Sequence, residues 1–152
     1  MGEILDNFIE GEEKDQALFN LLNESFHRLN DDGLKSQKCE LVYYYFLWNA
    51  LSLLGYHSEV EICAGCHGKL ISSEVYFSGK EGGVICGECA KEKKTEGLDL
   101  CRRINSDIVK ILRIILFKNW QILSKLKIDM STKKLLSEVS ENALRSFCPS
   151  HY

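Results

Sequence analysis

Two pairs of cysteines constrain the fold of this 152-residue chain more than any other feature. The first pair is Cys63 and Cys66, the second is Cys86 and Cys89, and nineteen residues separate the pairs. A Cys-x-x-Cys turn directs two thiolates at one point. Two such turns complete the tetrahedral four-sulfur shell that Zn2+ prefers, with Zn–S distances of about 2.3 Å. Four protein ligands leave no position for water, so we expect one structural zinc ion.

The segment between the cysteine pairs is too short and too polar to bury a core of its own. Bound metal must therefore supply much of its folding free energy. Two β-favouring pieces, Val75 to Phe77 and Val84 to Ile85, flank a glycine-rich turn at residues 78–83. This pattern predicts the short β-hairpins of a zinc ribbon.

Amphipathic and apolar periodicity predicts helices on both sides of the ribbon. Residues 15–30 place leucines on one stripe with Phe26 beside it, and residues 39–54 are apolar nearly all round, as in a central, buried helix. Gly55 is expected to end the second helix in a left-handed cap. Beyond the ribbon, we expect a helix over residues 107–127 that Ser106 caps.

A last helix is expected to begin at Ser131 or Thr132 and to run through Leu135, Leu136, Val139, Ala143 and Phe147. The predicted fold class is therefore mainly α, a helical domain with an inserted small four-cysteine zinc ribbon of short β-hairpins. The helical domain takes residues 1–61 and 98–152, and the ribbon insertion takes residues 62–97.

Hydropathy and cysteine usage indicate a cytoplasmic protein. The longest apolar run, Leu41 to Trp48, is far shorter than a membrane span, and the N-terminus has no basic and apolar signal segment. Four of the seven cysteines have metal spacing, which suits a reducing compartment better than a disulfide scaffold. Cys39, Cys101 and Cys148 are then expected to be free thiols.

Charge is distributed unevenly along the chain. Residues 1–61 carry a net charge of −8, residues 62–101 carry −1, and residues 102–152 carry +6. Such asymmetry can steer an anionic partner to one side of a protein. The alternative is an ordinary solvated surface whose halves neutralise each other.

The expected helix at 107–127 carries the basic side chains on one face. On a helical wheel the polar members fall within an arc of about 140° and apolar side chains fill the opposite side. The arc contains Lys110, Arg113, Lys118, Gln121 and Lys125, and Phe117 and Trp120 lie within it or beside it. Basic residues interleaved with aromatics can bind nucleic acid or an acidic peptide that ends in an aromatic residue. The alternative is that both aromatics pack in the core. Arg102 and Arg103 either extend the candidate surface or only solvate helix ends and loops.

Several of these segments together resemble one known family. The sequence Tyr-Tyr-Phe-Leu-Trp-Asn-Ala-Leu-Ser-Leu-Leu-Gly-Tyr at residues 44–56 precedes Cys63-x-x-Cys66-x-Gly68. Tyr76-Phe77-Ser78 and Gly82-Gly83-Val84-Ile85-Cys86-x-x-Cys89 then follow. In this combination the chain resembles the C-terminal part of the bacterial recombination mediator RecO, from about Glu12 to Phe147.

The resemblance implies a DNA-repair role. The family binds single- and double-stranded DNA, anneals complementary strands, and works with RecR and the acidic tail of single-stranded DNA-binding protein in homologous recombination. Nucleoid association in the cytoplasm would follow. Family members begin with an OB-fold domain, and no five-stranded barrel fits into residues 1–61, so this chain is expected to lack that domain.

Other readings of the same residues stay open. A generic zinc-ribbon adaptor needs no link to repair, and four cysteines also accept iron in a redox protein of rubredoxin type. Cys63 to His67 is literally a c-type haem attachment motif, but it would leave the second cysteine pair without a role. The chain has no glycine-rich phosphate loop, no GxSxG elbow and no HExxH helix, so we expect no enzyme.

Overall fold

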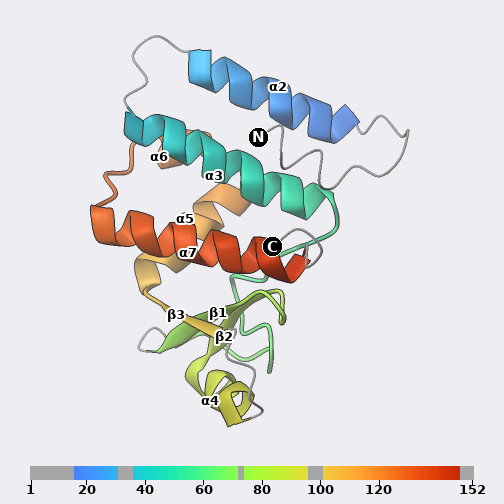
Figure 1. The fold of residues 1–152 in the computed structure, drawn as a ribbon, viewed down its shortest axis with the longest axis vertical. Helices are drawn as coiled ribbons and strands as arrows, with labels where there is room; N and C mark the ends of the chain where they lie inside the picture. Colours follow the sequence, from blue (N-terminus) through green and yellow to red (C-terminus); the bar gives the residue numbers. More distant parts are fainter. Residues whose placement is uncertain (1–15, 31–35, 72–73, 96–100, 148–152) are drawn as a thin grey trace. The chain divides into compact units, whose positions relative to one another are not determined.

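The computed structural model describes residues 16–30, 36–71, 74–95 and 101–147, and these residues are mainly helical with one small sheet (Figure 1). The helices are α2 (Gln16–Asn30), α3 (Ser36–Leu53), α4 (Gly87–Thr95), α5 (Ser106–Leu116), α6 (Trp120–Leu123) and α7 (Met130–Phe147). The strands are β1 (Val75–Ser78), β2 (Gly83–Cys86) and β3 (Cys101–Ile104). The predicted fold class is confirmed.

The chain divides into two compact units. Unit 1 comprises residues 1–56 and 114–126, and unit 2 comprises residues 57–113 and 127–152. The boundary falls within α5, whose last residues belong to unit 1. The predicted boundaries of a ribbon insertion at 62–97 stay a prediction.

In unit 1, α2 forms where the leucine periodicity predicts it. Leu18, Leu21 and Ser25 are buried, and the Ser25 hydroxyl donates a hydrogen bond of 2.8 Å to the Leu21 carbonyl. Because this hydrogen bond satisfies the buried hydroxyl within the helix, serine is tolerated on the buried face of α2. Phe26, which flanks the stripe, keeps 47% of its surface exposed.

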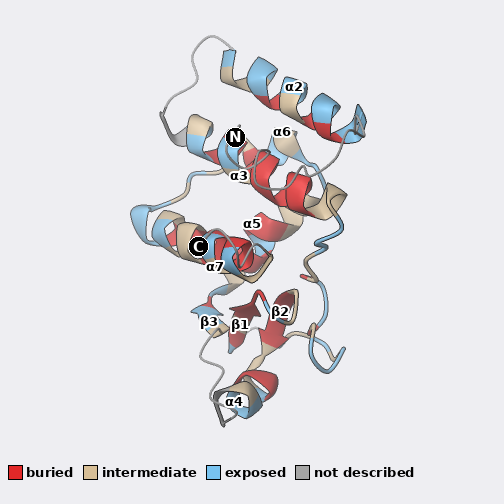
Figure 2. Ribbon diagram, turned by 45° about the vertical axis from the view of Figure 1, so that its right-hand side comes forward, coloured by how far each residue is buried: buried red, intermediate tan, exposed pale blue. Residues whose placement is uncertain are grey.

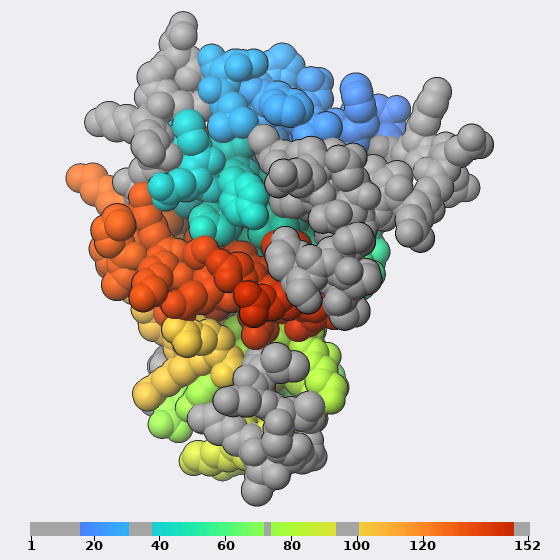
Figure 3. All heavy atoms as spheres, viewed as in Figure 1, coloured from blue at the N-terminus to red at the C-terminus, as the bar shows by residue number. Residues whose placement is uncertain are grey.

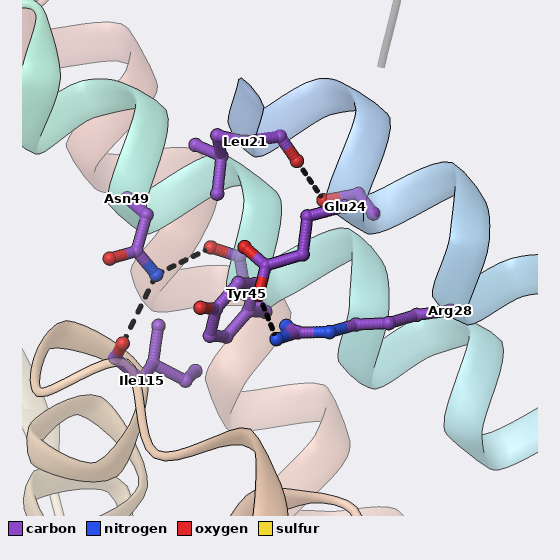
Figure 4. Close-up of polar contacts among 7 residues, drawn as sticks. Leu21, Glu24, Arg28, Tyr45, Asn49 and Ile115 are labelled. Carbon is purple, nitrogen blue, oxygen red and sulfur yellow. Dashed lines mark hydrogen bonds and ion pairs between the residues drawn. The ribbon is translucent and has the colours of Figure 1, made fainter. Parts of the chain in front are cut away.

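Helix α3 is the buried centre of unit 1, as its composition predicts. Every residue from Tyr45 to Leu51 is buried, and Asn49 is the polar residue among them (Figure 2). Its amide nitrogen donates to the carbonyls of Tyr45 at 2.8 Å and Ile115 at 3.1 Å, as Figure 4 shows. The second bond ties α3 to the end of α5 inside a low-dielectric core, where an unpaired amide would be costly. In the described part of the chain, no helix is long and apolar enough to cross a membrane.

Gly55 ends α3 as predicted. Its φ is +94°, its N–H donates to the Ser52 carbonyl at 3.1 Å, and the Tyr56 N–H donates to the Leu51 carbonyl at 2.9 Å. These two bonds form a Schellman motif, in which a left-handed residue closes the last helical turn.

The prediction of one helix over residues 107–127 is wrong. Helix α5 ends at Leu116, and the single turn α6 begins at Trp120. Between them Lys118 adopts a φ of +56°, with its N–H bonded to the Ile115 carbonyl at 2.9 Å. The Asn119 side chain then accepts from the Ile122 N–H at 3.2 Å and caps α6. Apolar periodicity continues through the break, so it gave no sign of the turn.

The predicted N-caps of α5 and α7 are each displaced toward the N-terminus. The Asn105 side chain, and not Ser106, accepts from the Ile108 N–H at 3.0 Å. The Asp129 carboxylate, and not Ser131 or Thr132, accepts from the Thr132 N–H at 2.7 Å. Both caps use the spacing in which a short oxygen-bearing side chain reaches the third residue of the helix.

Unit 2 is built around a three-stranded antiparallel sheet of order β2-β1-β3. The predicted hairpin pairs Tyr76 with Ile85, and the unpredicted strand β3 pairs Arg103 with Tyr76 on the other side. Because side chains alternate along strands, these three residues share one face. Helix α4 packs on that face, against a cluster that includes Ile85 and Ala90.

Helix α7 covers the opposite face, which carries Val75 and Phe77 (Figure 1). Its Asn142 side chain accepts a bond of 3.0 Å from the Gly79 N–H in the hairpin turn, and its Glu138 forms an ion pair with Arg102. A methyl group on Gly79 would lie 2.8 Å from the Asn142 carbonyl oxygen, so the turn can approach α7 because it has no side chain there. The sheet therefore lies between α7 and α4.

Candidate metal centre and interaction surfaces

The first cysteine pair lies in a tight loop before β1. The Cys63 N–H donates to the Gly68 carbonyl at 2.8 Å, and the His67 N–H donates back to the Cys63 carbonyl at 2.8 Å. His67 takes a left-handed φ of +58°, which turns the chain after Cys66. These bonds form the tight turn that the Cys-x-x-Cys spacing predicts.

The second cysteine pair spans the end of a strand and the start of a helix. Cys86 is the last residue of β2, and Cys89 lies in the first turn of α4. The spacing alone predicted a second turn of the same kind and did not distinguish it from this strand-to-helix junction. The sheet positions Cys86, and the helix positions Cys89.

The four sulfur atoms converge on one point. All four lie within 4.8 Å of one another, with Sγ–Sγ distances of 3.8 Å between Cys63 and Cys89 and 3.9 Å between Cys66 and Cys86. A tetrahedron of sulfurs about 2.3 Å from a zinc ion has edges of about 3.8 Å. The four cysteines therefore lie close enough to bind one metal ion, and the donor set suits a thiophilic one.

Backbone N–H groups stabilise a negative charge on one sulfur of the cluster. The Cys63 sulfur accepts the N–H groups of Cys66 at 3.5 Å and Cys86 at 3.3 Å. Burial opposes ionisation of this thiol, but the backbone donors outweigh it and lower its pKa to about 6. Burial, together with the neighbouring thiols, raises the pKa of Cys89. The two shifts favour a thiolate at Cys63 and a protonated thiol at Cys89, so metal binding must displace a proton from Cys89.

The remaining cysteines form no disulfide in the described residues. Cys39 and Cys101 are free, as predicted, and Cys148 lies outside the described residues. Cys101 packs against the cluster of Cys63, Ile85, Cys89 and Ala90. Its thiol is a neighbour of the metal-binding cluster and not one of its four converging sulfurs.

The predicted basic residues of unit 2 have different environments. Arg102 is paired with Glu138, Lys110 is paired with Asp107 at 3.1 Å, and Arg103 is exposed. Arg113 is half-buried, and its Nε donates to the Val60 carbonyl at 2.9 Å. Arg113 therefore holds the backbone before the first cysteine pair, a structural contact that helical-wheel reasoning did not anticipate.

The predicted residues of unit 1 lie between the end of α5 and the segment that follows α6. Lys118 and Lys125 are exposed, and Phe117 keeps 66% of its surface exposed. Trp120 is half-buried and meets the Tyr45 ring edge-on, with centroids 5.7 Å apart. The two aromatics thus differ, since Trp120 packs on α3 while Phe117 faces solvent.

Sequence reasoning missed Arg28. Its guanidinium lies 4.2 Å from the Tyr45 ring centroid and 4.5 Å from that of Trp120. It also pairs with Glu24 one turn earlier, and Figure 4 shows Arg28 with Glu24 and Tyr45. Cation–π contact on two rings fastens α2 to α3 and α6. The Glu-Arg spacing at i, i+4 was the available signal.

Comparison with known proteins identifies the family. The model for the C-terminal part of recombination protein O matches residues 1–148. This chain belongs to that family. A protein of Dehalococcoides mccartyi named DNA repair protein RecO is 32% identical over 144 residues, which are 95% of this chain and 51% of that protein. The protein of the same name from Caldicellulosiruptor saccharolyticus is 29% identical over 88% of this chain and 50% of its own length. The RecO resemblance is confirmed, and the chain spans about half the length of these relatives.

Proposed function

We propose that this chain acts in DNA repair and homologous recombination as the C-terminal, non-catalytic part of a recombination mediator. The observation that carries the proposal is the family match over residues 1–148. Relatives named DNA repair protein RecO, which align with 95% of this chain, support it. In this role the chain binds DNA, RecR and the acidic tail of single-stranded DNA-binding protein. Its proposed location is the cytoplasm, at the nucleoid.

The same proposal assigns one structural Zn2+ to Cys63, Cys66, Cys86 and Cys89. Sulfur separations of 3.8 and 3.9 Å favour a tetrahedral ion, and four thiolates favour a thiophilic metal. Two of the sulfurs belong to buried residues. A closed four-sulfur shell serves to hold the loop and α4 on the sheet.

In unit 1, the proposed partner surface combines Phe117 with Lys118 and Lys125. Phe117 has an exposed phenyl ring, which can stack on a base or receive an apolar peptide end, and the exposed Lys118 and Lys125 can meet phosphates or carboxylates. Trp120 is half-buried, and its ring packs on Tyr45, so it is less available to a partner than Phe117 is. In unit 2, Arg102, Arg103, Lys110 and Arg113 are proposed contacts, and of these Arg113 is the least available, since it binds the Val60 carbonyl.

Fluorescence anisotropy tests the unit 1 surface. The probes are a labelled oligothymidylate and a labelled peptide of aspartates ending in phenylalanine, both at low salt. We expect the double variant Phe117→Ala, Lys125→Glu to weaken binding by about tenfold or more, since loss of one stacking contact alone is worth about 1 kcal/mol or more. Both residues are exposed, so the variant should fold.

The matched control is Phe19→Ala with Lys127→Glu. Phe19 is 63% exposed on α2 and Lys127 is exposed, so the control makes the same chemical changes at residues that the proposed surface does not include. It should bind as the wild type does. Failure of the wild type to bind either probe, or equal losses in the two double variants, would refute the proposed surface.

A further inference from the structure

Strand β3 lies at one edge of the sheet, and β2 lies at the other. The outer side of β2 has backbone hydrogen-bond partners, whereas the outer side of β3 has none among the described residues. On the outer side of β2 the preceding loop pairs with the strand: the Val84 N–H donates to the Glu59 carbonyl at 2.8 Å, and the Ala64 N–H donates to the Val84 carbonyl at 2.8 Å. Among the described residues, no backbone hydrogen bond reaches the outer side of β3. Antiparallel pairing leaves alternate residues of such a strand with outward N–H and C=O groups.

A hollow follows this open edge. It has a volume of about 560 Å3 and is lined by residues 101–105, by Tyr76 of β1 and by Leu135 of α7. Tyr76 and Arg103 are register partners on the sheet face that carries α4, whereas Leu135 comes from the helix on the opposite face. In Figure 3 the gold surface of this segment adjoins the orange surface of α7. The hollow therefore straddles the edge, as an added strand requires.

The charge of the hollow is positive. Arg102 is satisfied by the Glu138 carboxylate on α7. Arg103 is exposed, and within the described residues it has no ion-pair partner. An opposite charge placed directly across from Arg103 on a neighbouring strand would be favourable, and a like charge would be unfavourable.

We propose that β3 binds an extended segment of another protein, which adds beside it as a fourth strand. This segment places an acidic side chain opposite Arg103 and an apolar side chain toward Leu135. Because side chains alternate along a strand, the recognised pattern is apolar and acidic residues in alternation. The inference rests on unit 2 alone and does not depend on the proposed repair function.

Two other occupants fit the edge less well. Nucleic acid offers phosphate oxygens, which accept from N–H groups but leave the outward carbonyls of β3 unpaired. A second copy of this chain would bring the two arginines of one β3 against those of the other. Like charges across a strand pair are unfavourable, so the edge selects against self-pairing.

The direct test is the anisotropy of a fluorescein-labelled peptide of alternating valine and glutamate added to the full chain. We expect saturable binding, a loss of about tenfold for Arg103→Glu, and no binding of a peptide of alternating valine and lysine. Lys127→Glu makes the same charge change at an exposed position that does not line the hollow, and it should bind as the wild type does.

N-methylated peptides test the strand pairing itself. One peptide carries N-methyl groups on the valines and a second carries them on the glutamates. A strand beside β3 donates from only one of these two sets, so one peptide should lose binding by at least about tenfold and the other should keep it.

The proposal would be overturned if the wild type did not bind the valine-glutamate peptide, or if it bound the two methylated peptides equally. It would also be overturned if oligothymidylate of the same charge displaced the valine-glutamate peptide, or if Arg103→Glu bound that peptide with unchanged affinity. Concentration-dependent dimerisation of the wild type that the valine-glutamate peptide reverses would show that a second copy occupies the edge instead.

Discussion

At the scale of single residues, one carboxylate determines where the last helix begins. Asp129 accepts hydrogen bonds from the Thr132 N–H at 2.7 Å and from the Ser131 hydroxyl at 2.8 Å. These bonds favour the charged form, so the pKa of Asp129 is lowered. The helix therefore draws stability from the ionised cap.

We predict that Asp129→Ala lowers the melting temperature by roughly 2 to 4 °C at neutral pH, the usual effect of losing a helix cap. Asp129→Asn keeps an accepting oxygen and should lose less. Since the folded pKa lies below the unfolded one, the contribution is present above the unfolded pKa and is lost as pH falls through the folded value. Thermal unfolding followed by circular dichroism should show the wild type and Asp129→Asn converging as the pH falls through the lowered pKa of Asp129. A constant difference from pH 7 to pH 2 would contradict the role of the charge.

At the scale of elements, two helices end in the same motif with different residues. Gly55 closes α3, and Lys118 closes α5, where the Asn119 N–H donates to the Ile114 carbonyl at 3.0 Å. Glycine adopts positive φ without cost, whereas lysine pays about 1 kcal/mol. The end of α3 could be predicted because glycine marks it. The end of α5 could not, because lysine there looks like an ordinary helical residue.

We predict that Lys118→Gly stabilises the protein by up to about 1 kcal/mol, because it relieves the left-handed strain. The matched substitution Lys110→Gly, in the regular part of α5, should destabilise by about 1 kcal/mol. Chemical denaturation of the three proteins measures both effects. The same sign for both substitutions would show that α5 continues through residue 118.

Some of the other elements could be predicted because local sequence determines them, and the rest could not because they depend on tertiary contacts. The hairpin of β1 and β2 follows from β-favouring residues on both sides of a glycine-rich turn, and α3 follows from its continuous apolar surface. Strand β3 contains two adjacent arginines and becomes a strand because β1 offers it an edge, which no local pattern reveals. The convergence of four sulfurs was predictable from spacing alone. The helical first turn around Cys89 and the backbone contact of Arg113 depend on tertiary packing.

At the scale of the whole molecule, the two units do not depend equally on metal. Unit 1 has an apolar core along α3 that includes Trp48 and Phe46, and it contains none of the four clustered cysteines. Unit 2 holds all four, and its sheet face toward α4 is packed with cysteines and only a few apolar side chains. Loss of metal should therefore loosen the first cysteine loop and α4 while the helices of unit 1 persist.

The metal content of the full chain decides whether the four cysteines form a structural zinc centre. Native mass spectrometry with elemental analysis should find one zinc per chain and a colourless protein. Cys86→Ser should lose the zinc, with most of the helical circular dichroism retained and residues 62–92 becoming accessible to protease. A structural zinc centre would be contradicted by a wild type that binds no metal or that carries iron with visible absorption. A Cys86→Ser variant that keeps stoichiometric zinc would contradict it as well.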